Sequence, residues 1–191
     1  MLSLYGARKK KFKKFSQDRH KTVFRVECHT ERRKSKKSVQ MFASPYCFSR
    51  IHSEENFKSQ MQEIGINVNV PKEEYNQRSV AACSDETHLA ILISFGDRVL
   101  LVNKIAKTLK SNKTPILLIS STEDNPIKEY ANYQLYLYSK KNHYNKISSF
   151  PTRLSLLYIL DILFACYFDT DYDNNLKNKL SYYKKFVSIN I

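Results

Sequence analysis

The 191-residue chain lacks tryptophan and contains only 3 glycines and 5 prolines. Collagen-like chains, low-complexity segments and glycine-rich repeats need far more glycine or proline, so the composition excludes these architectures. An apolar amino-terminal run is also missing, because lysines appear within the first ten residues, and we expect no secretory signal peptide. The chain does contain 42% hydrophobic residues, which is enough for a normal core.

Cysteine and histidine are too scattered to suggest a disulfide framework or a metal site. The 4 cysteines, at positions 28, 47, 83 and 166, lie far apart, and no C-x-x-C pair is present. None of the 5 histidines is three or four residues from another, which is the spacing that places two ligands on one helix face. We therefore predict a reducing, cytoplasmic environment, with no metal ion and no other cofactor.

The positive charge of the chain belongs to an amino-terminal arm, residues 1–38. This arm holds 14 Lys or Arg and 3 acidic residues, net +11, whereas residues 39–191 hold 18 basic and 15 acidic residues, net +3. Such a charge run is usually a solvated linker. The segment KKKFKKF at Lys9–Phe15 also suits contact with nucleic acid, and a membrane surface is the third alternative. We expect any contact with DNA through this arm or another domain.

From Val39 onward, short apolar runs alternate with segments of helical periodicity, as in parallel strands joined by crossover helices. HLAILIS and PILLIS are continuously apolar and should lie in the middle of the sheet, whereas INVNV and YQLYLY alternate and should lie at its edges. The predicted strands are Val39–Phe42, Ile66–Val70, His88–Ser94, Pro115–Ser120 and Tyr133–Tyr138. The predicted fold class is α/β, a doubly wound three-layer αβα sandwich around a five-stranded parallel sheet.

Helices are predicted between these strands and after the last one. In Val99–Lys110 the apolar residues share one helix face, and Asn125-Pro126 opens a short helix. The most apolar segment, Arg153–Phe168, contains Asp161 and is shorter than the roughly 20 residues of a membrane span. We therefore interpret it as a buried helix and expect no membrane partner.

In such a fold, the loops beyond the carboxyl ends of the strands form the ligand site. Unpaired N–H groups and the positive ends of helix dipoles point into one small volume there, and hydroxyl side chains add donors, so the expected ligand is an anion. The loops in question, at 43–47, 94–98 and 120–122, follow the first, third and fourth strands. The predicted ligand-binding residues are Ser44, Cys47, Ser94, Gly96, Arg98, Ser120 and Ser121.

The run THLAILISFGDRVLLVNKIAKTLKSNKTPILLISSTEDNPIKEYANYQLYLY, followed by SSFPTRLSLLYILDILFACYF, resembles the SIS (sugar isomerase) domain of RpiR-type transcription regulators. With SVQMFASPYCFSRIHSEENFKSQMQEIGINVNV upstream, the resemblance spans about residues 39–170. It implies a homodimer that binds a sugar phosphate and thereby adjusts the DNA affinity of a separate helix-turn-helix domain, which is not recognisable in this chain. The expected organisation is a basic arm or linker at 1–38, the SIS domain at 39–180 and a tail at 181–191.

Two of the loops depart from the family pattern. In the first loop, Pro45 replaces a glycine and has no N–H to donate, and Cys47 stands at a serine position, either as a small substitute or as a reactive thiolate. In the second loop, Asp97 and Val99 replace a glycine and a threonine, or a one-residue gap places Arg98 at the threonine. The loss of two hydroxyl donors predicts affinity for a sugar phosphate that is weakened by roughly 10² to 10⁴-fold or lost.

The predicted function is the phosphosugar-binding effector domain of an RpiR-like transcription regulator, with weakened ligand binding. One alternative is an aldose/ketose phosphosugar isomerase, which needs a general base; Glu123 and His143 are the only candidates. Another is a domain that has lost its ligand and is kept for dimerisation. No catalytic residue is assigned.

Overall fold

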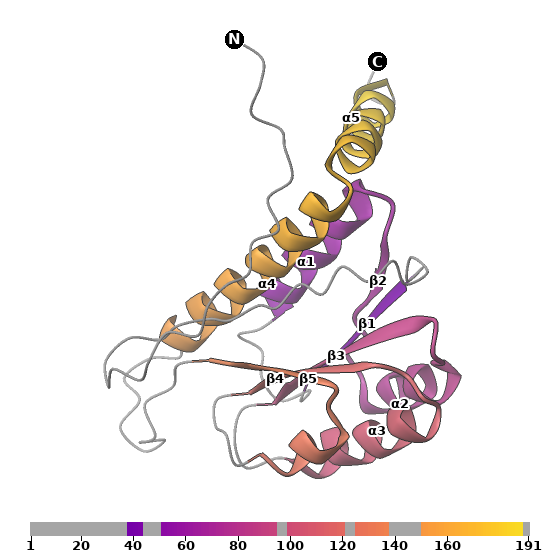
Figure 1. Cartoon of the computed structure of the whole chain (residues 1–191), viewed down its shortest axis with the longest axis vertical. Helices are drawn as coiled ribbons and strands as arrows, with labels where there is room; N and C mark the ends of the chain where they lie inside the picture. Colours follow the sequence, from indigo (N-terminus) through magenta and orange to yellow (C-terminus); the bar gives the residue numbers. More distant parts are fainter. Residues whose placement is uncertain (1–37, 44–50, 95–98, 121–124, 138–149, 189–191) are drawn as a thin grey trace.

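Five parallel strands form one sheet in the residues that the computed structural model describes, which are 38–43, 51–94, 99–120, 125–137 and 150–188 (Figure 1). Neighbouring strands follow the order β2-β1-β3-β4-β5, and all of these pairs are parallel. The strand bounds are β1 (Ser38–Ala43), β2 (Asn67–Asn69), β3 (His88–Ser94), β4 (Ile116–Ser120) and β5 (Tyr133–Tyr136). The predicted fold class is confirmed.

The position of each strand in the sheet follows from its hydrophobic pattern. The continuously apolar strands β3 and β4 lie inside the sheet, and every residue of β4 is buried. The alternating strands β2 and β5 form the two edges, and β2 buries only Val68 of its three residues. A strand covered on both faces can bury every side chain, whereas an edge strand keeps some of them in water. The predicted middle and edge strands are therefore confirmed.

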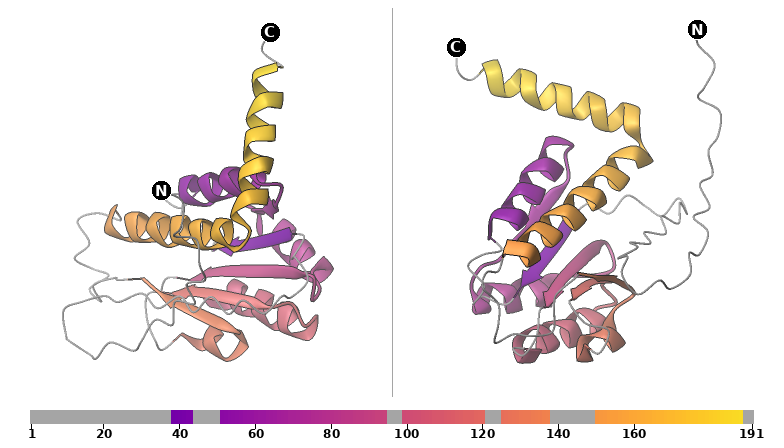
Figure 2. Two further views of the ribbon diagram at one scale, coloured as in Figure 1. Left: turned by 45° about the horizontal axis from the view of Figure 1, so that its top comes forward. Right: turned by 90° about the vertical axis from the view of Figure 1, so that its left-hand side faces the viewer.

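Helices cover both faces of the sheet (Figure 2). One face packs against α1 and α4, through a core cluster that includes Met41, Ile91 and Ile119. The opposite face packs against α2, α3 and the 3-10 helix η2, through a second cluster that includes Leu92 and Leu118. The helix bounds are α1 (Ile51–Glu63), α2 (Glu74–Cys83), α3 (Val99–Ser111), η2 (Pro126–Tyr130), α4 (Phe150–Thr170) and α5 (Tyr172–Ser188).

The strand order reverses direction between β1 and β3. From β1 the chain moves outward to β2, then returns past β1 to β3 and continues to β4 and β5. In doubly wound sheets the connections that leave such a pair of strands lie on opposite faces, so a crevice opens beyond their carboxyl ends. Residues 44–50 and 95–98 make these connections and lie outside the described residues. The fold thus directs attention to the last residues of β1 and β3.

Helix α4 is only partly buried, in contrast to the buried helix predicted from its composition. Its inner face inserts Leu156, Ile159 and Leu160 into the core, whereas Leu154 and Tyr158 are exposed. By length and composition alone α4 is long and apolar enough to cross a membrane, a test that the core helix of a soluble protein also passes. Apolar residues occur on all sides of α4, but only one side packs against the sheet, so the apolar residues on the other sides remain exposed.

Helix α5 continues the chain beyond α4 and extends away from the sheet (Figure 2). The predicted boundary at residue 180 falls inside this helix. Polar contacts tie α5 to the end of α4 and to the carboxyl-terminal end of α1. They join Asn175 Nδ2 to the Phe168 carbonyl (3.1 Å), Asn178 Nδ2 to the Ile64 carbonyl (3.4 Å), and Lys179 Nζ (2.9 Å) and Tyr183 Oη (3.2 Å) to the carboxylate of Glu63.

Candidate functional site

Two of the predicted ligand-binding serines lie next to each other at the carboxyl edge of the sheet. Ser94 is the last residue of β3 and Ser120 the last residue of β4, and the two are partners in the parallel register. Their exposed fractions are 4% and 0%. Ser44, Cys47, Gly96, Arg98 and Ser121, the remaining predicted site residues, lie outside the described residues, so their placement stays a prediction.

Both serine side chains face the layer formed by α2 and α3. Alternate residues of a strand point to the same face, and Leu92 and Leu118, two positions earlier, belong to the cluster on that side. On β5, Gln134 also reaches this edge, where its Nε2 donates a hydrogen bond to Ser120 Oγ (3.3 Å). The Ser120 carbonyl accepts from the Leu137 N–H (2.8 Å), which fixes the backbone at the end of β4.

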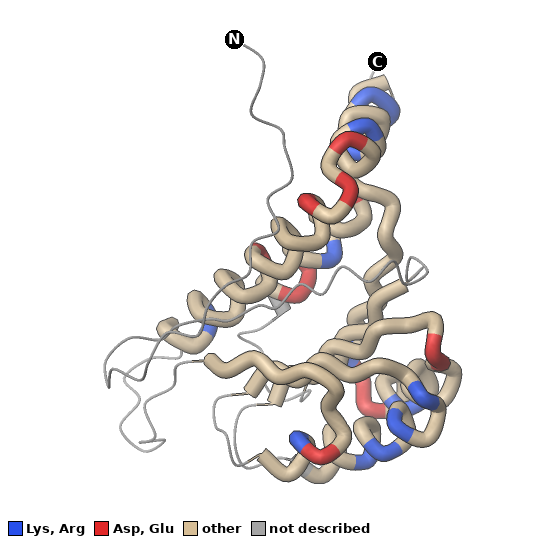
Figure 3. The backbone as a smooth tube through the Cα atoms, in the orientation of Figure 1, with Lys and Arg blue, Asp and Glu red and all other residues tan. Residues whose placement is uncertain are grey.

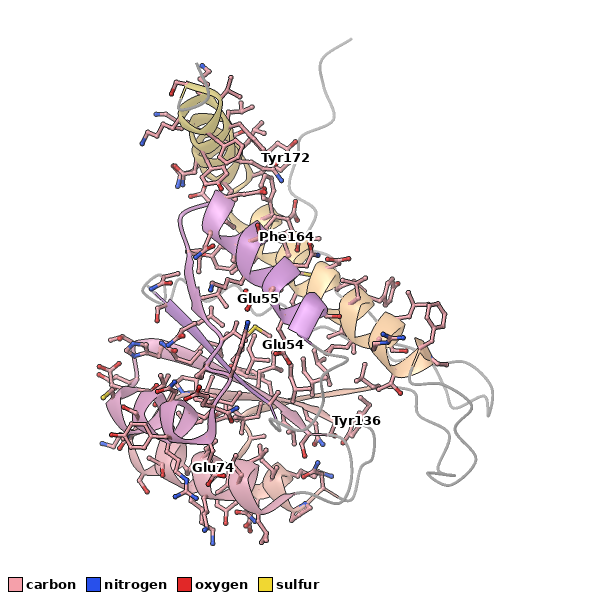
Figure 4. All side chains as sticks on the ribbon, turned by 180° about the vertical axis from the view of Figure 1, so that it is seen from behind. Glu54, Glu55, Glu74, Tyr136, Phe164 and Tyr172 are labelled. Atoms are coloured by element: carbon pink, nitrogen blue, oxygen red, sulfur yellow. The ribbon has the colours of Figure 1, made fainter. Side chains whose placement is uncertain are left out.

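Three further buried polar residues flank this edge and were not predicted as site residues. Ser53 and Glu54 lie in the first turn of α1, directly after the loop that leaves β1, and Gln77 lies on α2. Glu54 is labelled in Figure 4. Gln77 Nε2 donates to the carbonyl of Ala43, the last residue of β1, at 2.9 Å. The sequence feature that could have indicated Gln77 is a polar residue at a helix position that faces the core. Gln77 is four residues before the buried Ala81, but the short helix around it lacks a clear apolar stripe.

Acidic residues of α1 approach the carboxyl edge from the face of the sheet opposite to the serine side chains. Glu54 is only 6% exposed, and its place in the first turn of α1 puts its carboxylate in the favourable field of the helix amino terminus. Glu55, one residue later, is ion-paired with Lys72 (3.1 Å) and Lys58 (3.8 Å). A phosphate bound near this edge would be repelled by the charge of Glu54 to a degree set by its distance from the carboxylate.

His88 lies at the opposite edge of the sheet from Ser94 and Ser120. His88 opens β3, and its Nδ1 lies 2.8 Å from Asp85 Oδ1, at the other end of the strand from Ser94. Hydrogen bonds from the side chain and backbone of Thr87 and from His88 lower the pKa of Asp85 from 3.8 to about 2. His88 thus closes a turn before the strand and does not contribute to the candidate site.

The turn before β3 predicts a dependence of stability on pH. The folded-state pKa of Asp85 is depressed, so its contribution to stability is complete above about pH 4 and disappears as the pH falls from about 4 to about 2. Replacing Thr87 with valine removes the largest cause, so we expect the pKa of Asp85 to rise toward 3.8 in an NMR titration of its carboxyl group. The same pKa in wild-type and Thr87→Val chains would contradict this assignment.

Metal ligation has no support in the part of the chain that is described. There, no group of three or more His, Cys, Asp or Glu side chains lies close enough together to hold a metal ion. The described cysteines, Cys83 and Cys166, are not disulfide-bonded. Glu123 and His143, the two candidate bases of the isomerase alternative, lie outside the described residues. The site chemistry that the structure does describe consists of hydroxyls, amides and one buried carboxylate.

A family model for the SIS domain matches residues 52–163. No curated protein matches the chain in sequence. The fold is similar to that of the Vibrio vulnificus NanR protein complexed with ManNAc-6P, with a TM-score of 0.68 and 10% sequence identity. That match covers 81% of this chain but only 57% of the NanR chain, so this chain spans less than two thirds of that protein.

Two other solved structures show the same architecture. The sugar isomerase domain of an RpiR transcription factor from Sphaerobacter thermophilus has a TM-score of 0.59 and 13% identity, and the match covers 74% of each chain. The hypothetical protein MJ1247 from Methanococcus jannaschii, whose structure infers a molecular function of 3-hexulose-6-phosphate isomerase, has a TM-score of 0.55 and 20% identity. That match covers 75% of this chain and 77% of the other. At such low identities the likeness establishes the fold, and function has to be argued from the site.

Proposed function

The chain belongs to the SIS domain family, and from that premise we propose that it is a phosphosugar-binding effector domain of an RpiR-like transcription regulator. The observation that carries the proposal is the pair of buried hydroxyl side chains, Ser94 and Ser120, at the carboxyl ends of adjacent parallel strands. Hydroxyl groups and helix amino termini at that edge donate hydrogen bonds to phosphate oxygens. NanR, which is similar in fold, is itself complexed with ManNAc-6P.

In this proposal the domain senses its ligand and leaves contact with DNA to another part of the protein. Ser44 and Ser121, in the loops after β1 and β4, add hydroxyls to Ser94 and Ser120, and Arg98 offsets the charge of the phosphate. The basic arm, residues 1–38, or a separate domain contacts DNA. Ligand binding shifts the population of two arrangements of the subunits, and one of these arrangements binds DNA more tightly. The protein acts in the cytoplasm.

A phosphosugar isomerase is the second candidate function, and one observation favours it. Glu54 is a buried carboxylate at the same edge of the sheet as Ser94 and Ser120, and aldose/ketose interconversion needs a base beside the sugar. If Glu54 has this role, ManNAc-6P or fructose-6-phosphate should be converted into an isomer when incubated with the wild-type chain. NMR spectra of the sugar phosphate recorded over time separate an enzyme from a sensor.

Thermal unfolding in the presence of sugar phosphates tests the proposed function. A ligand that binds only the folded state raises the melting temperature, and at 100 times its dissociation constant it adds about 2.7 kcal/mol of stability. We expect a rise with at least one of ManNAc-6P and fructose-6-phosphate, without turnover. No rise with any member of a wider panel of sugar phosphates would contradict the proposal and favour a domain kept only for dimerisation.

Restoring the missing hydroxyls should tighten binding. The double change Cys47→Ser and Val99→Thr adds two donors at positions where the family has hydroxyls, and each hydrogen bond to a charged group contributes about 1.5 to 3 kcal/mol. We expect the affinity for a sugar phosphate, measured by calorimetry, to rise by at least about 10-fold. Cys83→Ser, the same chemical change at an exposed position on α2, serves as the control. Unchanged affinity in the double variant would contradict the loop alignment.

We also propose that two copies of the chain associate through α4 and α5. The exposed apolar side chains on these helices would be covered by a second copy. They are Phe150, Leu154, Tyr158, Tyr172, Leu176, Leu180, Tyr182, Tyr183, Phe186 and Val187. Scattered apolar residues are normal on a surface, but ten on two consecutive helices are the kind of apolar surface that marks an interface.

Charge favours a second copy as the occupant of this surface. Helix α5 carries four lysines and one aspartate, whereas α1 carries three glutamates and one lysine (Figure 3). Within one copy, Lys179 of α5 already pairs with Glu63 of α1. In a two-fold symmetric contact the same patch faces itself, so the other lysines of each α5 can approach the acidic residues of the other copy.

A further inference from the structure

Gln77 is a buried amide whose hydrogen bonds are only half satisfied. Its exposed fraction is 1%, although glutamine is mostly found in contact with water. Its Nε2 donates to the Ala43 carbonyl at 2.9 Å, whereas its buried Oε1 accepts no hydrogen bond from any other group in the described part of the chain. A buried acceptor without a donor costs free energy, so such an atom in a folded protein calls for an explanation.

The amide of Gln77 lies at the crevice that the strand order creates. Ala43 ends β1 and is the register partner of Ile93, so the carbonyl that Gln77 contacts lies one residue before the level of Ser94. Gln77 belongs to α2, which covers the face of the sheet toward which Ser94 and Ser120 point. Its Oε1 is bonded to the same carbon as Nε2 and therefore lies at this edge as well.

The chemistry of Gln77 complements that of the serines. The hydroxyls of Ser94 and Ser120 can donate hydrogen bonds to the oxygens of an anion, whereas a glutamine Oε1 can only accept. The groups of a sugar phosphate that donate are its hydroxyls. The amide is also held in place, because the bond to Ala43 fixes its orientation before any ligand arrives. An oriented, buried acceptor beside oriented donors suits a ligand that combines hydroxyl groups with an anionic group.

We propose that Gln77 Oε1 accepts a hydrogen bond from a hydroxyl group of the bound carbohydrate. Gln77 would then recognise the sugar and not the phosphate. This inference rests on the proposed phosphosugar-binding function and adds the residue that distinguishes a sugar phosphate from a simple anion. It also identifies α2 as a wall of the site.

Other amides in the described residues lack this combination of features. Gln134 reaches the same edge, but it is only partly buried, and its Oε1 is not a buried acceptor without a donor. Gln40 also has a buried Oε1 without a donor, but it lies three residues before the end of β1, and its Nε2 donates back toward Ser38 at the start of the strand. Gln40 thus has the same unsatisfied chemistry away from the edge, which makes it a matched control.

The test compares Gln77→Met with Gln40→Met. Methionine has nearly the shape of glutamine but has no strong acceptor, and both variants lose one amide donor and one buried oxygen. Calorimetric titrations with ManNAc-6P and fructose-6-phosphate, and thermal unfolding with inorganic phosphate, report on the whole ligand and on the anion alone. We expect Gln77→Met to weaken sugar phosphate binding by about 5- to 30-fold and to leave the stabilisation by inorganic phosphate unchanged. Gln40→Met should bind the sugar phosphate with the affinity of the wild-type chain.

Each other outcome overturns a specific claim. Wild-type binding of a sugar phosphate with unchanged affinity in Gln77→Met would overturn this inference alone. Equal weakening of sugar phosphate and inorganic phosphate would show that Gln77 only positions the β1 loop, which also overturns it. No binding by the wild-type chain would overturn the proposed function and this inference with it. If Gln77→Met does not fold, Gln77→Asn, which retracts the amide by one methylene group, is expected to show the same selective loss.

Discussion

Replacing Glu54 with glutamine should tighten the binding of sugar phosphates by about 10- to 100-fold. Glu54 is buried in the first turn of α1, and this helix begins directly after the loop that leaves β1, at the carboxyl edge of the sheet. Like charges about 4 to 8 Å apart repel by about 2 to 4 kcal/mol at an effective dielectric constant of 20, and glutamine keeps the size of the side chain without its charge. A relief of about 1.4 to 2.8 kcal/mol corresponds to the expected change. Calorimetry with ManNAc-6P at fixed ionic strength measures it.

Glu55→Gln is the matched control for this experiment. Glu55 is the next residue along α1, and its carboxylate is partly exposed and paired with Lys58 and Lys72. Solvent and these lysines screen its charge, so we expect less than about a 3-fold change. Unchanged binding in Glu54→Gln would contradict the predicted repulsion, and weaker binding would show that the carboxylate contacts the sugar itself. A simultaneous loss of isomer formation in that variant would support the isomerase alternative.

Changing Leu180 and Phe186 together to lysine should raise the dissociation constant of the dimer by at least about 100-fold. Both side chains are more than half exposed on α5, and the proposed interface would bury them. Burial of two lysines in place of two apolar anchors removes hydrophobic contacts and adds a desolvation penalty, and each anchor of this kind contributes about 2 kcal/mol or more. Sedimentation measurements over a range of protein concentrations give the dissociation constants of both chains.

Leu100→Lys tests whether the effect belongs to this surface. Leu100 is 82% exposed on α3, on the other side of the sheet from α4, so the same substitution there should leave the dimer intact. Because all three changed side chains are exposed, the melting temperatures of the separated subunits should remain close to each other. A wild-type chain that is monomeric at all concentrations, or equal dissociation in Leu100→Lys, would contradict the proposed interface.

The architecture could be predicted from the sequence because the hydrophobic pattern of each strand indicates how many of its faces are buried. The seven residues of HLAILIS cannot be accommodated at an exposed edge, and INVNV cannot be buried on both sides without enclosing asparagines. The last helix was less predictable. The apolar side chains of residues 181–188 are exposed and do not pack into the core, so the core pattern did not indicate that α5 extends beyond residue 180.

The candidate site was predicted less completely than the fold. Ser94 and Ser120 could be found because a polar residue at the end of an apolar strand is conspicuous. Glu54 was not predicted as a site residue, and Gln77 lies on a short helix whose inward face is mixed. Their burial depends on how α1 and α2 pack against the sheet, which is a tertiary property that local patterns do not contain.

Helix α1 connects the candidate site to α5 through the contacts between Glu63 and α5. Glu54 lies in the first turn of this helix, beside the candidate site, and Glu63 lies in its last, where Lys179 and Tyr183 of α5 are attached. A single rigid helix therefore joins the edge that would receive a small molecule to the helix that would meet the neighbouring subunit. Any tilt of α1 around its midpoint would swing the far tip of α5 through a larger arc than the displacement that started it.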